Sequence, residues 1–252
     1  MKNLILSLLT LFPASLVAQN SGSITYEEKI QFKIDLGDDS PMSEDIKSMI
    51  PSSRSTEKIL LFNQEHSVYK NLDDSNGDES ISRETGSSTV QIVVRRPENV
   101  TYQNLTENKV IEKQEFMDRI FLISDDSEKQ AWKITGEQKE ILGYMCQQAT
   151  TVRDSSKIEA WFTPQIAVSS GPGIYGGLPG LILETNKNDG AAVVTAKNID
   201  LQTDVNDQII PPSKGKKVNR KQFKKIQREK MEEMQLQYGG SGNGSRVFIQ
   251  RN

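Results

Sequence analysis

Two residue types that dominate enzyme active sites occur once each in this sequence, as His66 and Cys146. A thiol nucleophile needs a neighbouring base, so these two residues form the sole thiol dyad that the chain could assemble. No cysteine-enzyme signature surrounds Cys146, and the chain contains no G-x-S-x-G sequence. One histidine and one cysteine also cannot supply the four ligands of a zinc site. We therefore predict no catalytic residue and no metal site, and a buried apolar role for Cys146.

Glycine and proline are concentrated in the stretch from Gly171 to Glu184. Its first six residues match G-x-G-x-x-G, the pattern of dinucleotide-binding loops. Such a loop must lead into a helix, and the segment from Gly177 to Gly180, with Pro179 inside it, prevents a helix from starting there. We therefore predict that the chain binds no cofactor, and that the stretch is a tight turn before a buried strand beginning at Leu181.

Basic residues far outnumber acidic ones between Lys214 and Lys230. This run gives a candidate docking patch for lipid phosphates or an acidic protein, or else a solvated helix face. The formal net charge of the whole chain is −3, which argues against a nucleic-acid partner. The residues assigned to the candidate docking patch are Lys221, Lys224, Lys225 and Arg228.

Two aromatic residues flank the glycine-rich stretch, Trp161 before it and Tyr175 within it. They are candidate groove aromatics for an apolar ligand, although packing in the core is the commoner role of such side chains. Carboxylates are abundant throughout the chain, so their number alone does not identify the acid pair of a hydrolase.

The N-terminal segment 1–18 has the pattern of a secretory signal peptide. Lys2 precedes an apolar run from Leu4 to Val17, and Ala18 supplies a small residue for cleavage. The run is too short for a membrane span, and no cysteine follows it to carry a lipid. We predict an exported protein, periplasmic, outer-membrane associated or secreted, with no lipid anchor and no transmembrane segment after cleavage.

The chain after the signal segment predicts short strands with turn signals about ten residues apart, which is typical of antiparallel sheets. No segment between these strands is long enough for the crossover helix of a parallel sheet. The expected fold is mainly β, a curved antiparallel sheet or partial barrel of about ten strands. The expected strands are 23–32, 59–62, 66–69, 89–95, 99–105, 109–116, 119–124, 131–135, 144–153, 157–162, 181–186 and 191–198.

One helix is expected, basic and near the C-terminus. Asn219 and Gln222 have the spacing of a capping box, and Phe223 begins an apolar stripe that ends near Gln237. Residues 71–88 are rich in Asp, Ser, Asn and Gly, and predict a long polar loop. We expect a signal peptide over 1–18 and a β domain over 19–210, with the helix and tail of 211–252 packed on that domain.

Several ordered blocks resemble the GLPGLI family of exported bacterial proteins. The block Gly177-Leu178-Pro179-Gly180-Leu181-Ile182 is similar to the signature that names the family. Further blocks are 132–135, 141–149, 159–166 and Gly171-Pro172, and the resemblance covers about residues 23 to 235. The family has no established activity, so the resemblance implies an exported location and no mechanism.

Together these observations predict a non-enzymatic envelope protein that binds an apolar ligand, such as a lipid, or an envelope partner. An alternative is an accessory component of an outer-membrane assembly, which docks on an outer-membrane protein through the basic helix. A second alternative is a carboxylate-dependent hydrolase, which would need two acids converging in a cleft.

Overall fold

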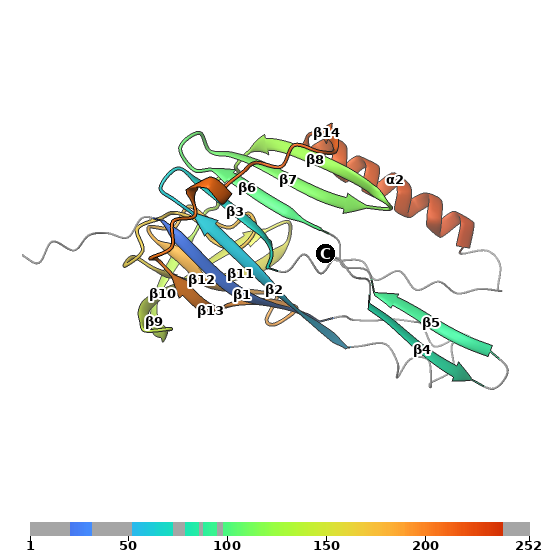
Figure 1. Cartoon of the computed structure of the whole chain (residues 1–252), viewed down its shortest axis with the longest axis horizontal. Coiled ribbons are helices and arrows are strands. Elements are labelled where there is room, and N and C mark those ends of the chain that lie inside the picture. The colour runs from blue at the N-terminus through green and yellow to red at the C-terminus, as the bar shows by residue number, and fades with distance from the viewer. Residues whose placement is uncertain (1–20, 32–51, 73–78, 86–87, 95–97, 239–252) are drawn as a thin grey trace, which may run out of the picture.

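The computed structural model describes residues 21–31, 52–72, 79–85, 88–94 and 98–238, and these residues form mainly strands (Figure 1). The segment 1–18, for which a signal peptide is expected, lies outside the described residues. The strands are β1 Gly22–Gln31, β2 Ser53–Phe62, β3 His66–Asn71, β4 Glu79–Thr85, β5 Ser88–Val94, β6 Val100–Asn104, β7 Lys109–Phe116, β8 Arg119–Asp126, β9 Lys133–Ile141, β10 Tyr144–Arg153, β11 Ser156–Thr163, β12 Leu181–Lys187, β13 Ala192–Asp200 and β14 Lys216–Val218. The helices are the 3₁₀ turn η1 Asn206–Gln208 and the α-helix α2 Arg220–Tyr238.

Twelve of the described strands form one open sheet in the order β14-β8-β7-β6-β3-β2-β1-β13-β12-β11-β10-β9. The prediction of a mainly β fold with one C-terminal helix is confirmed within the described residues. The sheet has more strands than expected, and one of its pairs is parallel, because β14 joins β8 with Lys216 opposite Phe121. This short strand follows a long connection across the molecule, so its direction depends on where the chain returns to the sheet.

The loop prediction for 71–88 was wrong in part. β4 and β5 pair as a separate antiparallel two-stranded sheet with Ile81 opposite Ile92. Ile81 is the one apolar residue of β4, and it lies among Ser, Glu, Arg and Thr residues. Composition therefore did not reveal β4, whereas β5 was expected as the strand 89–95.

Several hairpins close through two-residue turns with positive φ at both positions, as the twist of antiparallel strands favours. Leu142 and Gly143 connect β9 to β10 with φ of 51° and 83°. Asp154 and Ser155 connect β10 to β11 with φ of 46° and 63°. The second of these turns carries Asp154 toward α2, where its carboxylate lies 3.1 Å from the Lys224 amine.

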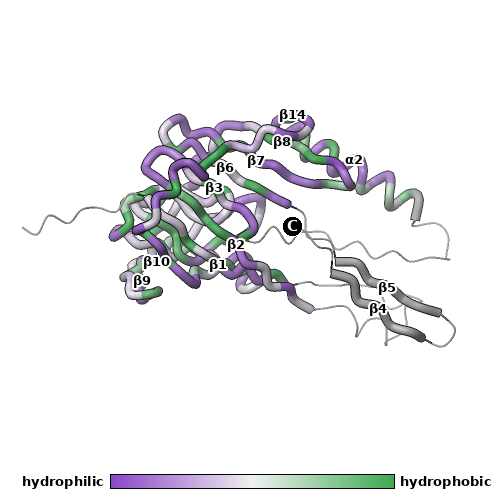
Figure 2. Tube along the Cα trace, viewed as in Figure 1, coloured by the Kyte–Doolittle hydropathy of each residue, from purple (hydrophilic) through white to green (hydrophobic). Residues whose placement is uncertain are grey.

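The main core cluster lies between the central strands and the chain that enters β12. Figure 2 shows hydrophobic residues concentrated in these strands and a more hydrophilic α2. Alternate residues of β1 point into the core, with Ile24 and Tyr26 fully buried. The Tyr26 hydroxyl donates a 2.6 Å hydrogen bond to the Ile182 carbonyl oxygen, which satisfies a buried polar group.

The helix α2 begins at the predicted capping box. The Asn219 side chain accepts a hydrogen bond from the Gln222 amide at 2.8 Å, and Gln222 Oε1 accepts one from the Asn219 amide at 2.9 Å. Phe223 is 2% exposed and packs with Phe121 and Val218. Charged residues dominate the rest of α2, and among the described residues no helix is both long and apolar enough to cross a membrane.

Candidate functional site

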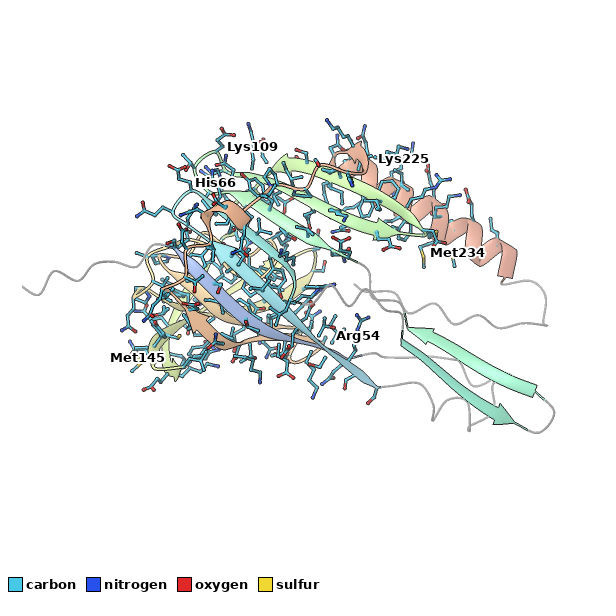
Figure 3. All side chains as sticks on the ribbon, viewed as in Figure 1. Arg54, His66, Lys109, Met145, Lys225 and Met234 are labelled. Atoms are coloured by element: carbon cyan, nitrogen blue, oxygen red, sulfur yellow. The ribbon has the colours of Figure 1, made fainter. Side chains whose placement is uncertain are left out.

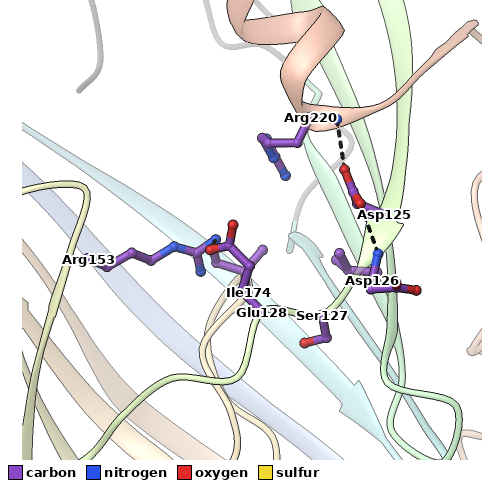
Figure 4. A pocket seen from close by; sticks show the side chains of 8 residues that line it. Asp125, Asp126, Ser127, Glu128, Arg153, Ile174 and Arg220 are labelled. Atoms are coloured by element: carbon purple, nitrogen blue, oxygen red, sulfur yellow. Dashed lines mark hydrogen bonds and ion pairs between the residues drawn. The ribbon is translucent and has the colours of Figure 1, made fainter.

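A pocket with charged walls lies where several distant segments meet (Figure 4). Its cavity volume is about 80 Å³. This is well below the roughly 300 Å³ of a site for a whole small-molecule ligand, and above the roughly 10–15 Å³ that one water needs. The pocket therefore fits a group of a few non-hydrogen atoms. Its lining residues are Val110 from β7, Asp125 to Glu128 from the end of β8 and beyond, Arg153 from β10, Ile174 from the glycine-rich stretch, and Arg220 from α2.

Strand pairing places one wall of the pocket on a single face of the sheet. Val110 lies opposite Asp125 in β8 and opposite Gln103 in β6. Residues directly opposite in a ladder share a face, so these three side chains point the same way. Gln103 Nε2 donates a 2.8 Å hydrogen bond to the Gly173 carbonyl oxygen, so this is the face that the glycine-rich stretch covers.

Side chains hold the glycine-rich stretch against this wall. Besides Gln103, Gln130 Nε2 donates to the Ile174 carbonyl oxygen at 3.1 Å, and Trp132 Nε1 donates to the Gly176 carbonyl oxygen at 2.8 Å. A segment without regular structure must satisfy its carbonyl groups through such contacts. These bonds position the Ile174 side chain at the pocket.

The first turn of α2 closes the pocket on another side. Asp125 accepts a 3.0 Å hydrogen bond from the Arg220 amide, as Figure 4 shows, and a carboxylate is favourable at this positive end of a helix. The Arg220 guanidinium forms an ion pair with Glu112, a β7 carboxylate that is 6% exposed as a residue. Burial lowers the pKa of Arg220 from its ordinary value, but an arginine remains protonated at neutral pH.

A second ion pair lies across the pocket from α2. Arg153 Nη2 is 2.9 Å from Glu128 Oε2, and the two side chains are 21% and 66% exposed. Figure 4 shows Arg153 and Arg220 reaching toward the pocket from different sides, with Glu128 facing Arg153. The carboxylate of this pair, Glu128, is well exposed. It can therefore exchange part of its contact with Arg153 for a contact with a bound group.

The pocket can bind a small polar group that both donates and accepts hydrogen bonds. Its guanidinium groups are donors, its carboxylates are acceptors, and Val110 and Ile174 add an apolar surface. Three carboxylates against two guanidinium groups in the lining disfavour an anion. No cluster of His, Cys, Asp and Glu that could hold a metal ion occurs within the part of the chain that the structure describes.

The structure does not bring the two candidate groove aromatics together. Trp161 is 8% exposed and belongs to the main core cluster, where the Lys139 amine lies 4.2 Å from its ring centroid. Tyr175 packs with the separate cluster of Leu178 and Ile182. Trp161 and Tyr175 therefore contribute to packing in different clusters, and they do not face each other across one groove.

Carboxylates offset most of the cations that were assigned to a docking patch. Lys224 pairs with Asp154, Lys225 with Glu229 at 3.7 Å, and Arg228 with Glu232 at 4.0 Å. Figure 3 shows Lys225 among the exposed side chains of α2. Pairs at this spacing on an exposed helix contribute a few tenths of a kcal/mol each, about 0.3–0.5, and indicate a solvated helix face. The fourth residue of the set, Lys221, is also exposed on α2.

His66 and Cys146 do not form a dyad. The His66 ring stacks on Tyr102, and its Nδ1 lies 3.0 Å from the tyrosine hydroxyl. Cys146 is fully buried in the main core cluster, as predicted. Burial raises the pKa of its thiol to about 11, so the thiol is neutral and unreactive at ordinary pH.

We expect native Cys146 to react with a thiol reagent at pH 8 at least about a hundredfold more slowly than in the unfolded chain, since its pKa lies about two units higher. The unfolded thiol loses its proton first as pH rises, so the free energy of unfolding should fall between about pH 9 and 11. Labelling kinetics with and without denaturant measure the first effect, and Cys146→Ala is the control for the second. Equal labelling rates in the two states would contradict the burial of Cys146.

The pocket residues were missed by reasoning from sequence. Asp125, Asp126 and Glu128 follow a buried strand in an acid-rich chain, and nothing in their local spacing separates them from other acids. The available signal was the position of Arg220 directly after the capping residue Asn219, which places a charge at the start of a helix. That signal does not identify the strand beneath the helix.

The family of the chain is established by a family model described as "N-glycanase peptide, N-terminal domain", which matches residues 55–225. This chain belongs to that family. Two solved structures of PNGF-II, in the P21 and C2 space groups, are similar in fold, with TM-scores of 0.54 and 0.54 and identities of 23% and 22%. The match covers 82% of this chain and 33% or 32% of theirs, so the chain spans about a third of their length. No curated protein matches the chain.

These comparisons correct the earlier identification. The assignment to the GLPGLI family was wrong, because the family model that matches is the one named for an N-glycanase. The segment from Gly177 to Ile182 keeps its structural role, with Leu181 and Ile182 fully buried in β12. A short sequence rich in glycine and proline indicates a tight turn, but it does not by itself identify the family of a protein.

The functional prediction is corrected by the same finding. The expectation of a non-enzymatic protein that binds an apolar ligand or an envelope partner was wrong, because the family model that matches residues 55–225 is that of the N-terminal domain of an N-glycanase. The rival hypothesis of docking through the basic helix is withdrawn with it. A histidine or cysteine pair would have been visible in the sequence, whereas carboxylates, which can also act as general bases, cannot be located from composition.

Proposed function

We propose that this protein acts in the release of N-linked glycans from glycoproteins, and that the charged pocket engages the bond between sugar and asparagine. The family assignment over residues 55–225 supports the reaction class. The observation that carries the site is the meeting of Glu128, Arg153 and Arg220 around one small cavity. Because the chain spans about a third of the PNGF-II structures, the activity of a whole N-glycanase comes to this chain as a proposal.

An N-glycanase hydrolyses the amide bond that joins the glycan to the asparagine side chain. Water adds to the amide carbonyl, the carbon–nitrogen bond breaks, and the leaving nitrogen takes up a proton. Such a reaction needs a base for the water and donors for the oxygen that gains negative charge. We assign the base to Glu128, whose side chain is 66% exposed, and the donors to Arg153 and Arg220.

The ion pairs give each assigned group a fixed position. Arg153 holds Glu128 at 2.9 Å, and Asp125 holds the Arg220 backbone at 3.0 Å. Glu112, a buried carboxylate of β7, forms an ion pair with the Arg220 guanidinium. A preorganised donor stabilises developing charge better than a free one, since it requires no rearrangement during the reaction.

We expect Glu128→Gln to lower kcat/KM for glycan release by about 10²–10⁴-fold, the range for loss of a general base. The measurement is the glycan released from an N-glycopeptide by the purified protein, resolved by mass spectrometry. Glu98→Gln is the matched control, because Glu98 pairs with Lys113 at 2.7 Å and does not line the pocket. Absence of release by the wild-type protein, or equal loss in both variants, would overturn the proposal.

We also propose that the protein is exported and that its signal peptide is cleaved after Ala18. Its substrates would then be glycoproteins outside the cell. The pattern of Lys2 followed by the apolar run to Val17 supports this proposal. Intact-mass measurement of the protein recovered from culture medium or envelope should give a chain that begins at Gln19. Recovery of a chain that still carries Met1 from those fractions would contradict it.

A further inference from the structure

Residues 173–177 of the glycine-rich stretch differ in burial from the residues on either side of them. Pro172 and Leu178 are buried, whereas 173–176 are half-buried and Gly177 is exposed. The Tyr175 amide donates a 3.2 Å hydrogen bond to the Pro172 carbonyl oxygen, and 173–177 belong to no strand of the described sheets. This segment is therefore a short loop between two buried ends.

Close contacts with the sheet fix the stretch before and after this loop. A Cβ added at Gly171 would lie 2.7 Å from Ile182 Cβ, and one added at Gly180 would lie 2.2 Å from the Thr163 carbonyl oxygen. The Ile182 amide also donates to the Ser170 carbonyl oxygen at 3.0 Å. Because the core is closely packed, the backbone has little room to move at these points.

Gly173 and Gly177, at the two ends of the loop, have more open surroundings. Their φ angles are 62° and 83°. Apart from the adjoining residues of the chain, no atom of the described residues lies within 4 Å of an ideal Cβ at either position. Glycine can adopt many backbone angles at low cost, and hinge motions are absorbed by a few residues that can change φ and ψ. These two glycines can therefore act as hinges.

A few hydrogen bonds hold the loop against the sheet. The carbonyl oxygens of residues 173, 174 and 176 accept hydrogen bonds from Gln103 Nε2 at 2.8 Å, Gln130 Nε2 at 3.1 Å and Trp132 Nε1 at 2.8 Å. The Gly177 amide donates to Ser169 Oγ at 3.0 Å. Each bond adds little net stability, because water can replace the lost partner when the loop moves away. The closed position is therefore held by contacts that can be broken without unfolding the sheet.

From these contacts we propose that residues 173–177 form a flap over the charged pocket, which opens by rotation at Gly173 and Gly177. Ile174 belongs to the flap and is one of the lining residues that Figure 4 shows. Opening moves Ile174 away from Val110, and so widens a cavity of about 80 Å³ that is too small for a whole ligand. The proposal concerns access to the pocket and does not depend on the reaction that takes place there.

Hydrogen exchange of the full chain, measured by NMR, distinguishes flap opening from unfolding. The amides of Tyr175 and Gly177 report on the flap, and those of Leu181 and Ile182 report on β12. Opening of a short loop exposes little surface. Exchange at Tyr175 and Gly177 should therefore be faster than at Leu181 and Ile182, and independent of urea below the unfolding transition. An equal dependence on urea at all four amides would show that the loop opens only when the protein unfolds, and would overturn the proposal.

Trp132→Phe removes one of the bonds that close the flap, and keeps an aromatic ring in the cluster of Leu178 and Ile182. Exchange at Gly177 should become roughly 2–10-fold faster, the effect expected for loss of one hydrogen bond. Trp161→Phe is the matched control, because the Trp161 indole donates to Glu159 at 3.1 Å and packs in the main core cluster. The control should leave exchange at Gly177 unchanged. An unchanged rate in Trp132→Phe, or an equal increase in both variants, overturns the flap.

The exchange measurement and the glycan-release assay fail in different ways, because hydrogen exchange needs no substrate. A flap that opens in a protein without glycan release would overturn the proposed function and leave the flap standing. Glycan release by a protein whose loop exchanges only through unfolding would overturn the flap alone.

Discussion

Replacing Gly180 with alanine should destabilise the fold by about 3 kcal/mol or more, combining backbone strain with a steric clash. Gly180 has φ of +151°, which side-chain-bearing residues rarely adopt, and an added Cβ would lie 2.2 Å from the Thr163 carbonyl oxygen. Thr163 is fully buried and lies opposite Leu181 in the pairing of β11 with β12. Neither β11 nor β12 can therefore move aside without disturbing the core. The steric overlap cannot be relieved at low cost, because the core is closely packed.

Gly177→Ala is the matched control for this prediction. Gly177 has φ of +83°, but no atom lies within 4 Å of its ideal Cβ position. Only the backbone strain remains there, about 1–2 kcal/mol. Urea unfolding followed by circular dichroism measures both variants. Equal destabilisation of the two would contradict the close approach of β11 to Gly180.

Truncating Phe223 to alanine should destabilise the protein by about 3–5 kcal/mol, the usual cost of removing a buried phenylalanine. Its ring lies 5.2 Å from that of Phe121 and 6.1 Å from that of Phe116, measured between centroids. These contacts attach α2 to β7 and β8. Loss of these contacts should also disrupt the charged pocket, because α2 positions Arg220, whose amide donates a hydrogen bond to Asp125.

Leu236→Ala is the control on the same helix, since Leu236 is 85% exposed and its truncation should change stability by less than about 0.5 kcal/mol. Thermal unfolding gives the stability of both variants, and hydrogen exchange of the amides in α2 shows whether the helix detaches first. A Phe223→Ala protein with unchanged exchange in α2 would show that other contacts hold the helix.

Most strands and the helix of this fold could be predicted from the sequence, because the patterns that indicate them are local. Alternation in β1 showed which side chains of the strand are buried, and the spacing of Asn219 and Gln222 located the start of α2. The strands β2 and β3 were also predicted from their own residues, as 59–62 and 66–69. Local signals failed for β4, whose composition resembles a loop, and for most of β9, whose residues are nearly all exposed and polar. Pairing with a neighbouring strand makes those segments strands.

The candidate site could not be read from the sequence in the same way. Alternation tells which residues share a face of a strand, but it does not tell which strands are neighbours or how strongly the sheet curves. The contact between the Arg220 amide and Asp125 joins residues 95 positions apart. Several such long-range contacts define the pocket, and each depends on the order of the strands in the sheet.

By itself, then, the sequence determined the mainly β class, the C-terminal helix with its cap, the burial of Cys146, and the sharp turn at Gly177 to Gly180. Tertiary structure alone decided the parallel pairing of β14 with β8, and the convergence of Glu128, Arg153, Ile174 and Arg220 around one cavity. The physical reason is that hydrophobic periodicity, capping and backbone angles act over a few residues. The position of a charge depends on the whole path of the chain that brings its partners together.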